Sequence, residues 1–244
     1  MDKNPLISVV IPTYNEERYI GDLLESIKQQ TYNNYEIIVI DYNSNDNTLK
    51  ICKSYNAKIF NTNKPGVSAA KNVGIKNASG DIIAFIDADY ILSKNVFEEV
   101  VKTFNEFQEV VEIEPRSRVN IKDLNIEKRV LFKFYSRWQN IYKYISFFTP
   151  VPAAYGCVFC RADIVKKAGL FNENINIDED KEFFARIRQY GKFKMIKSTA
   201  RKSFRRHLKQ GIIRTELIYF FSMIPAFLIK KVKIPLKPFR NKKN

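Results

Sequence analysis

The stretch DIIAFIDADY, Asp81 to Tyr90, joins a short apolar run to a pair of acidic residues. The run from Ile82 to Ile86 predicts a buried β-strand. Asp87 and Asp89 follow it directly, two residues apart. Because side chains alternate along a strand, residues i and i+2 face the same side. We therefore expect both carboxylates to face one side at the end of this strand.

The residues before this stretch alternate between strand and helix patterns. Apolar runs occur in LISVVIPTYN, YEIIVID and AKIFNT, and amphipathic helical segments such as NEERYIGDLLESIKQQ lie between them. This alternation predicts a mostly parallel sheet with helices on both faces. Ligands of such sheets bind beyond the carboxyl ends of the strands. Asn15, Asp41 and the two aspartates all fall at predicted strand ends, so we expect them to line one crevice.

The second half of the chain has a looser pattern. Helices are expected at 93–108, 123–146 and 178–190, and strands in EVVEIEP and AAYGCVFC. The aromatic residues of 123–155, including Trp138, fit an apolar or sugar-stacking acceptor site, and they also fit a core.

The paired aspartates suggest a cation site. Two neighbouring carboxylates repel each other unless a cation lies between them. Oxygen ligands suit Mg²⁺ or Mn²⁺, which commonly bridge one or two carboxylates to substrate phosphates. Two solvated aspartates in a turn are the alternative, because the pattern D-x-D is frequent by chance.

Three longer stretches resemble the family-2 glycosyltransferases of the GT-A fold over about residues 6–195. They are VVIPTYNEERYIGDLLESIKQQTYNNYEIIVIDYNSNDNT, NKPGVSAAKNVGIKNASGDIIAFIDADY and GLFNENINIDEDKEFFARIRQYG. The resemblance implies one domain over 1–200, with a nucleotide-sugar-binding half at 1–92 and an acceptor half at 93–200. It implies transfer of a sugar from a nucleotide-diphosphate sugar to an acceptor hydroxyl or phosphate, with inversion at the anomeric carbon.

The same resemblance assigns roles around a Mn²⁺ or Mg²⁺ ion. Asp89 is the stronger candidate ligand and Asp87 the second, and the metal would neutralise charge on the leaving diphosphate. The donor-binding residues that the resemblance implies are Pro12, Thr13, Tyr14, Asn15, Asp41, Tyr42, Lys71, Asp87 and Ala88. In some GT-A enzymes a histidine late in the chain binds the metal. His207 lies in a basic run, so a place on the solvated surface fits it better than a role as metal ligand.

The acidic segment near residue 180 supplies the acceptor side. The family's catalytic base corresponds to Asp180, with Glu179 as its neighbour and Asp178 as an alternative base. Three consecutive acids also suit a helix N-terminus. Arg186 would pair with an acid or a phosphate, and a surface salt bridge is the alternative.

Two positions depart from the family pattern. Family members often have a second aspartate after the second strand, which accepts the base N–H of uracil, but here Asp41 is followed by Tyr42. Tyrosine can stack on a base but cannot replace that carboxylate. This favours a guanosine or deoxythymidine nucleotide over UDP as the nucleotide of the donor. Lys71 replaces a more frequent arginine. It would reach the base or diphosphate, or would be an exposed helix lysine.

Charge is concentrated at the C-terminal end. The formal net charge is +15, and residues 201–244 contain 13 Lys and Arg against one acid, Glu216. The apolar run 217–229 would span about 20 Å as a helix, short of the roughly 30 Å hydrocarbon core. This favours an amphipathic basic tail on an anionic membrane surface and a lipid-linked acceptor. Packing against the domain or a second subunit is the alternative.

Composition favours a cytoplasmic enzyme, peripheral on the membrane. The three cysteines favour a reducing compartment, and the first residues do not form a signal peptide.

Two other functions compete with catalysis. One is a GT-A-fold protein that binds nucleotide sugar without turnover. The other is nucleic-acid binding through the tail, which the acid-lined crevice disfavours. The sequence leaves the oligomeric state open.

Overall fold

The computed structural model describes residues 4–120, 124, 126–145, 156–175, 179–205, 208 and 211. Asp178, His207 and the apolar run 217–229 lie outside these residues. The first elements along the chain alternate as predicted. They are β1 (Ile7–Thr13), α1 (Ile20–Lys28), β2 (Tyr35–Asp41), α2 (Thr48–Ser54), β3 (Lys58–Asn61), α3 (Val67–Asn77) and β4 (Ile82–Ile86).

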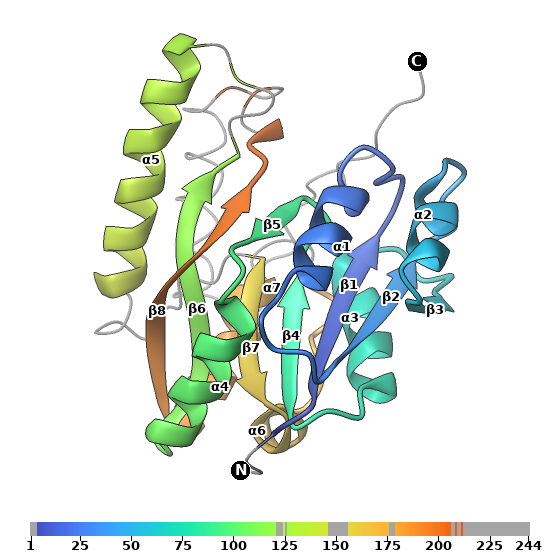
Figure 1. The fold of residues 1–244 in the computed structure, drawn as a ribbon. Helices are drawn as coiled ribbons and strands as arrows, with labels where there is room; N and C mark the ends of the chain where they lie inside the picture. The colour runs from blue at the N-terminus through green and yellow to red at the C-terminus, as the bar shows by residue number, and fades with distance from the viewer. Residues whose placement is uncertain are drawn as a thin grey trace.

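The later elements extend the same sheet. They are β5 (Tyr90–Leu92), α4 (Val96–Glu106), β6 (Val110–Val119), α5 (Ile126–Ile145), β7 (Cys157–Arg161), α6 (Ala162–Ala168), α7 (Glu179–Ile187), a 3-10 turn (Arg188–Tyr190) and β8 (Lys192–Lys202). The strand order is β3-β2-β1-β4-β7-β6-β8-β5. Strands β1 to β4 pair in parallel, whereas β7 runs antiparallel to β4 and β6. The predicted α/β fold with a mostly parallel sheet is confirmed (Figure 1).

Alternating strand residues supply two cores, one on each face of the sheet. Val9 and Ile11 of β1 pack in a core with α1, α2 and α4, while Val10 packs in another with α3, α6 and α7. Both faces are therefore buried, which explains why the parallel strands are near-continuous apolar runs. Cys157 and Cys160 are buried within β7.

Three details differ from the predictions. Asp87 and Asp89 lie in a turn between β4 and β5, where the Tyr90 N–H donates to the Asp87 carbonyl over 3.2 Å. The alternation of a strand therefore does not set their directions. Helix α1 begins only at Ile20; Asn15 has a left-handed conformation with φ of 53°, and residues 17–19 form a turn. Strands β5 and β8 were not predicted. In β8 only Phe193, Ile196 and Ala200 are buried, so its apolar pattern is weak.

In the part of the chain that is described, none of the helices combines the length and the apolar character needed to cross a bilayer.

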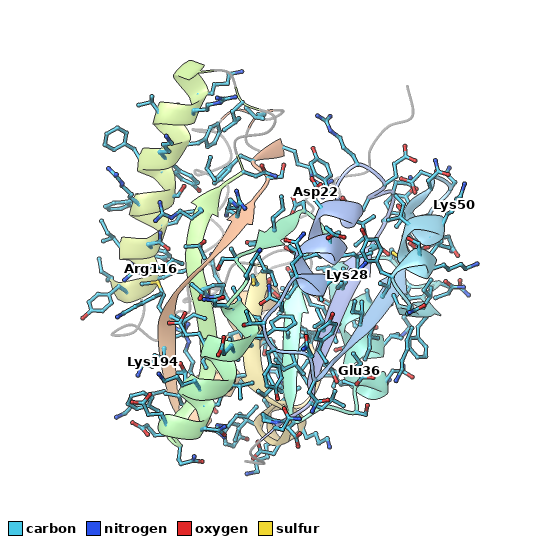
Figure 2. The ribbon with its side chains drawn as sticks, in the orientation of Figure 1. Asp22, Lys28, Glu36, Lys50, Arg116 and Lys194 are labelled. Atoms are coloured by element: carbon cyan, nitrogen blue, oxygen red, sulfur yellow. The ribbon has the colours of Figure 1, made fainter. Side chains whose placement is uncertain are left out.

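Glu36 links the amino ends of the central strands by hydrogen bonds, at the edge of the sheet opposite the strand carboxyl ends (Figure 2). It accepts hydrogen bonds from Ser8 Oγ at 2.5 Å, Lys58 Nζ at 2.7 Å, and Ser79 N and Oγ at 2.9 and 2.7 Å. Burial alone would raise the pKa of Glu36. The hydrogen bonds from Lys58, Ser8 and Ser79 outweigh burial and lower the pKa to about 2.

Glu36→Gln tests this contribution. The pKa of Glu36 is lowered from 4.5 to about 2 on folding. The carboxylate therefore stabilises the fold above about pH 4.5, and this contribution is lost as the pH falls towards about 2. We expect the variant to melt a few degrees below the unmodified protein at pH 7, with a difference that narrows over that acid range. Thermal unfolding followed by circular dichroism at several pH values measures this.

Glu109→Gln is the matched control, because its pairing with Lys192 at 3.8 Å is exposed and contributes little. A Glu36→Gln difference that stayed constant at every pH would show that packing, and not charge, explains the role of Glu36.

Candidate active site

The structure brings the predicted strand ends together. In the parallel register Thr13 of β1 lies beside Asp41 of β2, and β4 pairs with the other edge of β1. The carboxyl ends of all three strands therefore point to one edge of the sheet (Figure 1). Asp41, Thr13 and the Asp87–Asp89 turn follow one another along this edge, as the sequence predicts for Asp41 and the two aspartates.

Asp41 is fully buried and fixes the loop that follows β2. Its carboxylate accepts hydrogen bonds from Thr13 Oγ1 at 2.9 Å, Ser44 N at 2.7 Å and Ser44 Oγ at 2.5 Å. Ser44 Oγ in turn accepts from the N–H of Asn15 at 2.9 Å. These bonds position the ends of β1 and β2. They also direct the Asp41 oxygens inward, which favours an orienting role over direct contact with a nucleoside.

Tyr14 and Tyr42 form the aromatic part of this edge. Their ring centroids are 5.6 Å apart at an interplanar angle of 56°, and both rings are partly exposed. The Tyr42 N–H donates to the Thr13 carbonyl over 3.0 Å. A partly exposed tyrosine pair at the strand ends is suited to stacking on a flat ring.

Asp87 lies at the centre of the edge, against a glycine. Its N–H donates to the Gly156 carbonyl over 2.8 Å. A Cβ added at Gly156 would lie 1.9 Å from Asp87 Oδ2 and 3.1 Å from a ring carbon of Tyr90. A side chain at position 156 would therefore displace the carboxylate.

Lys71 of α3 and Asp180 of α7 form an ion pair near Asp87. Lys71 Nζ lies 2.5 Å from Asp180 Oδ1, and the lysine side chain is only 3% exposed. Burial alone would lower the pKa of Lys71. The nearby carboxylates of Asp180, Asp87 and Glu179 outweigh burial and raise it above the usual value. The alternative of an exposed helix lysine is therefore wrong.

Glu179 stands beside this pair at the start of α7. Loss of hydration and the adjacent Asp180 carboxylate raise the pKa of Glu179 to about 7, against the opposing charge of Lys71. The acids of the acceptor segment thus differ in environment, since Asp180 contacts the lysine directly.

Arg205, which follows β8, contacts two acids, Glu16 and Asp89. Its guanidinium contacts both carboxylate oxygens of Glu16 at 2.6 and 2.7 Å. Its Nε lies 3.3 Å from Asp89 Oδ2, and the Ser203 N–H donates to the Asp89 carbonyl over 3.1 Å. The guanidinium also lies 4.9 Å from the ring centroid of Tyr19. Arg205 therefore places positive charge against the candidate metal ligand.

Arg186 has a structural role in the described residues. It contacts Glu182 at 2.8 and 2.9 Å and donates to the carbonyl oxygens of Ala168 and Leu170. The structure thus shows the ion pair that the sequence left as an alternative.

Four residues of this site were not predicted: Glu16, Asn72, Gly156 and Arg205. Asn72 donates to the Phe171 carbonyl over 3.0 Å and accepts from its N–H over 2.8 Å, which joins α3 to the segment before α7. Glu16 directly follows Asn15, so its position in the motif was a usable signal. No signal in the sequence pointed to Arg205, because nothing distinguishes this arginine from the other basic residues among the 13 of 201–244.

The acids of this edge suit a divalent cation shared with a diphosphate. In the part of the chain that is described, no three His, Cys, Asp or Glu side chains converge into a cage of protein ligands. Mg²⁺ and similar ions, however, often use one or two carboxylates and take their other ligands from substrate phosphates and water. Asp89, already in contact with a cationic side chain, and Asp87 meet that description.

Comparisons with known proteins agree with this geometry. Residues 8–167 match the sequence profile of Glycosyl transferase family 2. Glycosyltransferase GlyG of Streptococcus pneumoniae is 38% identical over 107 residues, covering 41% of this chain and 36% of GlyG. The minor teichoic acid biosynthesis protein GgaA of Bacillus subtilis is 31% identical over 197 residues, covering 75% of this chain and 43% of GgaA. The chain thus spans less than half of each relative.

Solved structures show the same fold. Staphylococcus aureus TarS matches with a TM-score of 0.64 at 21% identity, over 81% of this chain and 60% of that chain. The mannosyltransferase PcManGT from Pyrobaculum calidifontis, solved with GDP-Man and Mn²⁺, matches with a TM-score of 0.64 at 18% identity, over 80% and 56%. Together with the profile match over more than half of the sequence, these results show that the chain belongs to glycosyltransferase family 2.

Proposed function

We propose that this protein is a metal-dependent, inverting glycosyltransferase that uses a nucleotide-diphosphate sugar. The observation that supports it most is the buried Lys71–Asp180 pair beside Asp87, at the edge where parallel strands end. One carboxylate is thereby oriented towards the place where a donor would lie. The acids that would bind a metal lie in the same crevice.

The reaction follows from these positions. The acceptor O–H gives its proton to the Asp180 carboxylate while its oxygen forms a bond to the anomeric carbon. The bond from that carbon to the diphosphate breaks, and its electron pair leaves with the diphosphate. Attack opposite the leaving group inverts the configuration. A divalent ion, Mn²⁺ or Mg²⁺, bound by Asp89 and Asp87 would offset the charge of the leaving group.

The protein's own charges prepare this step. The contact with Lys71 fixes the direction of the Asp180 carboxylate, and positioned groups of this kind lower the barrier without reorganising. The pKa of Glu179, raised to about 7, also suits a base at neutral pH. Glu179 is therefore the competing candidate within the described residues.

Asp180→Asn should lower the rate of transfer by roughly 10²–10⁴-fold, the usual contribution of general acid–base catalysis, because the amide cannot accept the proton. Donor binding should change little. Donor turnover and nucleotide affinity measure the two effects. Glu182→Gln is the matched control, because Glu182 lies on the same helix and contacts Arg186. Near-normal turnover in Asp180→Asn, with a large loss in Glu179→Gln, would transfer the role to Glu179.

Substitutions at two residues are expected to change metal binding in opposite directions. Asp89→Asn should weaken Mn²⁺-dependent binding of a nucleoside diphosphate far more than binding of the nucleoside. Arg205→Gln should strengthen binding of Mn²⁺ alone, because it removes the positive charge that lies 3.3 Å from Asp89 Oδ2. Isothermal titration with Mn²⁺, with and without nucleotide, measures both. The exposed Asp163, which lies 3.6 Å from Lys167 in its own helix, supplies the control Asp163→Asn. Equal Mn²⁺ affinity in all variants would remove Asp89 as ligand.

We also propose that Tyr42 shifts the donor preference from uridine towards guanosine or deoxythymidine nucleotides. Its ring beside Tyr14 can stack on a base, but it offers no carboxylate to the uracil N–H. Thermal-shift titrations with UDP, GDP and dTDP in the presence of Mn²⁺ test this. Tyr42→Asp should gain affinity for UDP, whereas Tyr42→Phe should not. UDP binding tighter than GDP and dTDP by about tenfold or more, about 1.4 kcal/mol, would contradict the proposal.

The proposed location is the cytoplasmic face of a membrane. The concentration of 13 basic residues in 201–244 supports contact with anionic lipid. A lipid-linked acceptor would then meet the crevice at the membrane surface.

A further inference from the structure

Helix α5 packs against the sheet with a mostly polar face. Its buried side chains recur at helical spacing and are Phe132, Ser136, Gln139 and Lys143. An ordinary helix of a globular protein buries its apolar face instead. The orientation of α5 is thus the reverse of the usual one.

Specific contacts fix this orientation. Lys143 Nζ lies 2.6 Å from Glu114 Oε2 of β6, and both side chains are almost fully buried. Asn140 exchanges two hydrogen bonds with the backbone of Ser117, at 2.7 and 2.9 Å. Phe132 packs on Phe204 with ring centroids 4.6 Å apart. Rotating α5 to bury its apolar face would break all of these contacts.

The outward face of α5 is consequently apolar and exposed. Besides Val130, which is 54% exposed, six larger apolar side chains line it, each 48–63% exposed: Leu131, Phe134, Trp138, Ile141, Tyr144 and Ile145. They recur every three or four residues along a helix of 20 residues, about 30 Å long. Single exposed apolar residues are normal, but a continuous stripe marks an interaction surface.

The charges beside the stripe indicate the partner. The exposed charged side chains described on α5 are Lys128, Lys133 and Arg137, all basic. Arg116 and Lys194 lie on the same side of the molecule, beside β6 and β8 (Figure 2). Apolar and aromatic residues flanked by basic residues, as on the described part of α5, are typical of helices that lie in the interface of an anionic bilayer. A soluble protein partner would not require one sign of charge.

We propose that the outward face of α5, defined by the six apolar residues above with Lys133 and Arg137, lies on an anionic lipid bilayer. This surface is separate from the tail at 201–244. It adds to the proposed function a defined side of the domain that faces lipid, and only the link to a lipid-linked acceptor rests on that function.

Trp138 reports on this contact directly, because it is the only tryptophan of the chain. The full-length protein is mixed with vesicles of phosphatidylcholine, with or without phosphatidylglycerol. We expect the Trp138 emission to shift to shorter wavelength and to become protected from acrylamide with the anionic vesicles only.

A matched pair of variants tests the charges. Lys133→Glu with Arg137→Glu should weaken the response. Lys28→Glu with Lys50→Glu makes the same change in net charge on exposed residues of α1 and α2, away from α5, and should leave the Trp138 response in place (Figure 2).

Two results would overturn the proposal. One is a Trp138 already protected without vesicles, which would mean that another part of the chain or a second copy covers α5. The other is co-sedimentation with anionic vesicles while Trp138 emission stays unchanged, which would leave membrane contact to the tail alone. Nucleotide binding in the same samples is scored separately. Its loss with a normal Trp138 response would count against the proposed reaction, not against this surface.

Discussion

The contact of α3 with the segment around α7 determines the site more than any other interaction. Lys71 and Asn72 are buried neighbours on α3, and they bind Asp180 and Phe171, 109 and 99 residues further along the chain. A buried ion pair is seldom the most stabilising choice, because both charges lose their hydration. Under the proposed function, this pair orients the Asp180 carboxylate beside the strand ends.

The parallel pairing of β1 with β2 and β4 supplies the remaining acids. It brings the ends of three strands to one edge. Glu16, which follows β1, therefore lies near Asp87 and Asp89, which follow β4. Cationic side chains offset this concentration of negative charge, Lys71 on one side and Arg205 on the other. Arg205 follows β8, so a late segment of the described chain adds a cationic side chain to the edge that the first strands form.

Sequence patterns predicted the parts of this structure that local composition determines. Strands β1, β2 and β4 were predicted because both their faces are buried and their apolar runs are continuous. Strand β8 was missed because lysines interrupt it, and its place depends on pairing with β6 over residues far away in the sequence. Sequence motifs were sufficient to single out Asp87 and Asp180. The burial of Lys71 and the contacts of Arg205 were not, because both result from long-range packing. The same holds for α5, whose amphipathic pattern does not say which face is buried.

The central claim, that Asp180 activates an acceptor for direct displacement of the nucleoside diphosphate, is tested most directly by stereochemistry. Water can serve as the acceptor, so the donor alone suffices once its nucleotide is known. Proton NMR of the anomeric signal, recorded before mutarotation, distinguishes the two products. Our account predicts that an α-linked donor first releases the β-sugar, with inverted configuration. Initial release of the α-sugar would contradict it, because retention requires a second displacement that a single base at Asp180 does not provide.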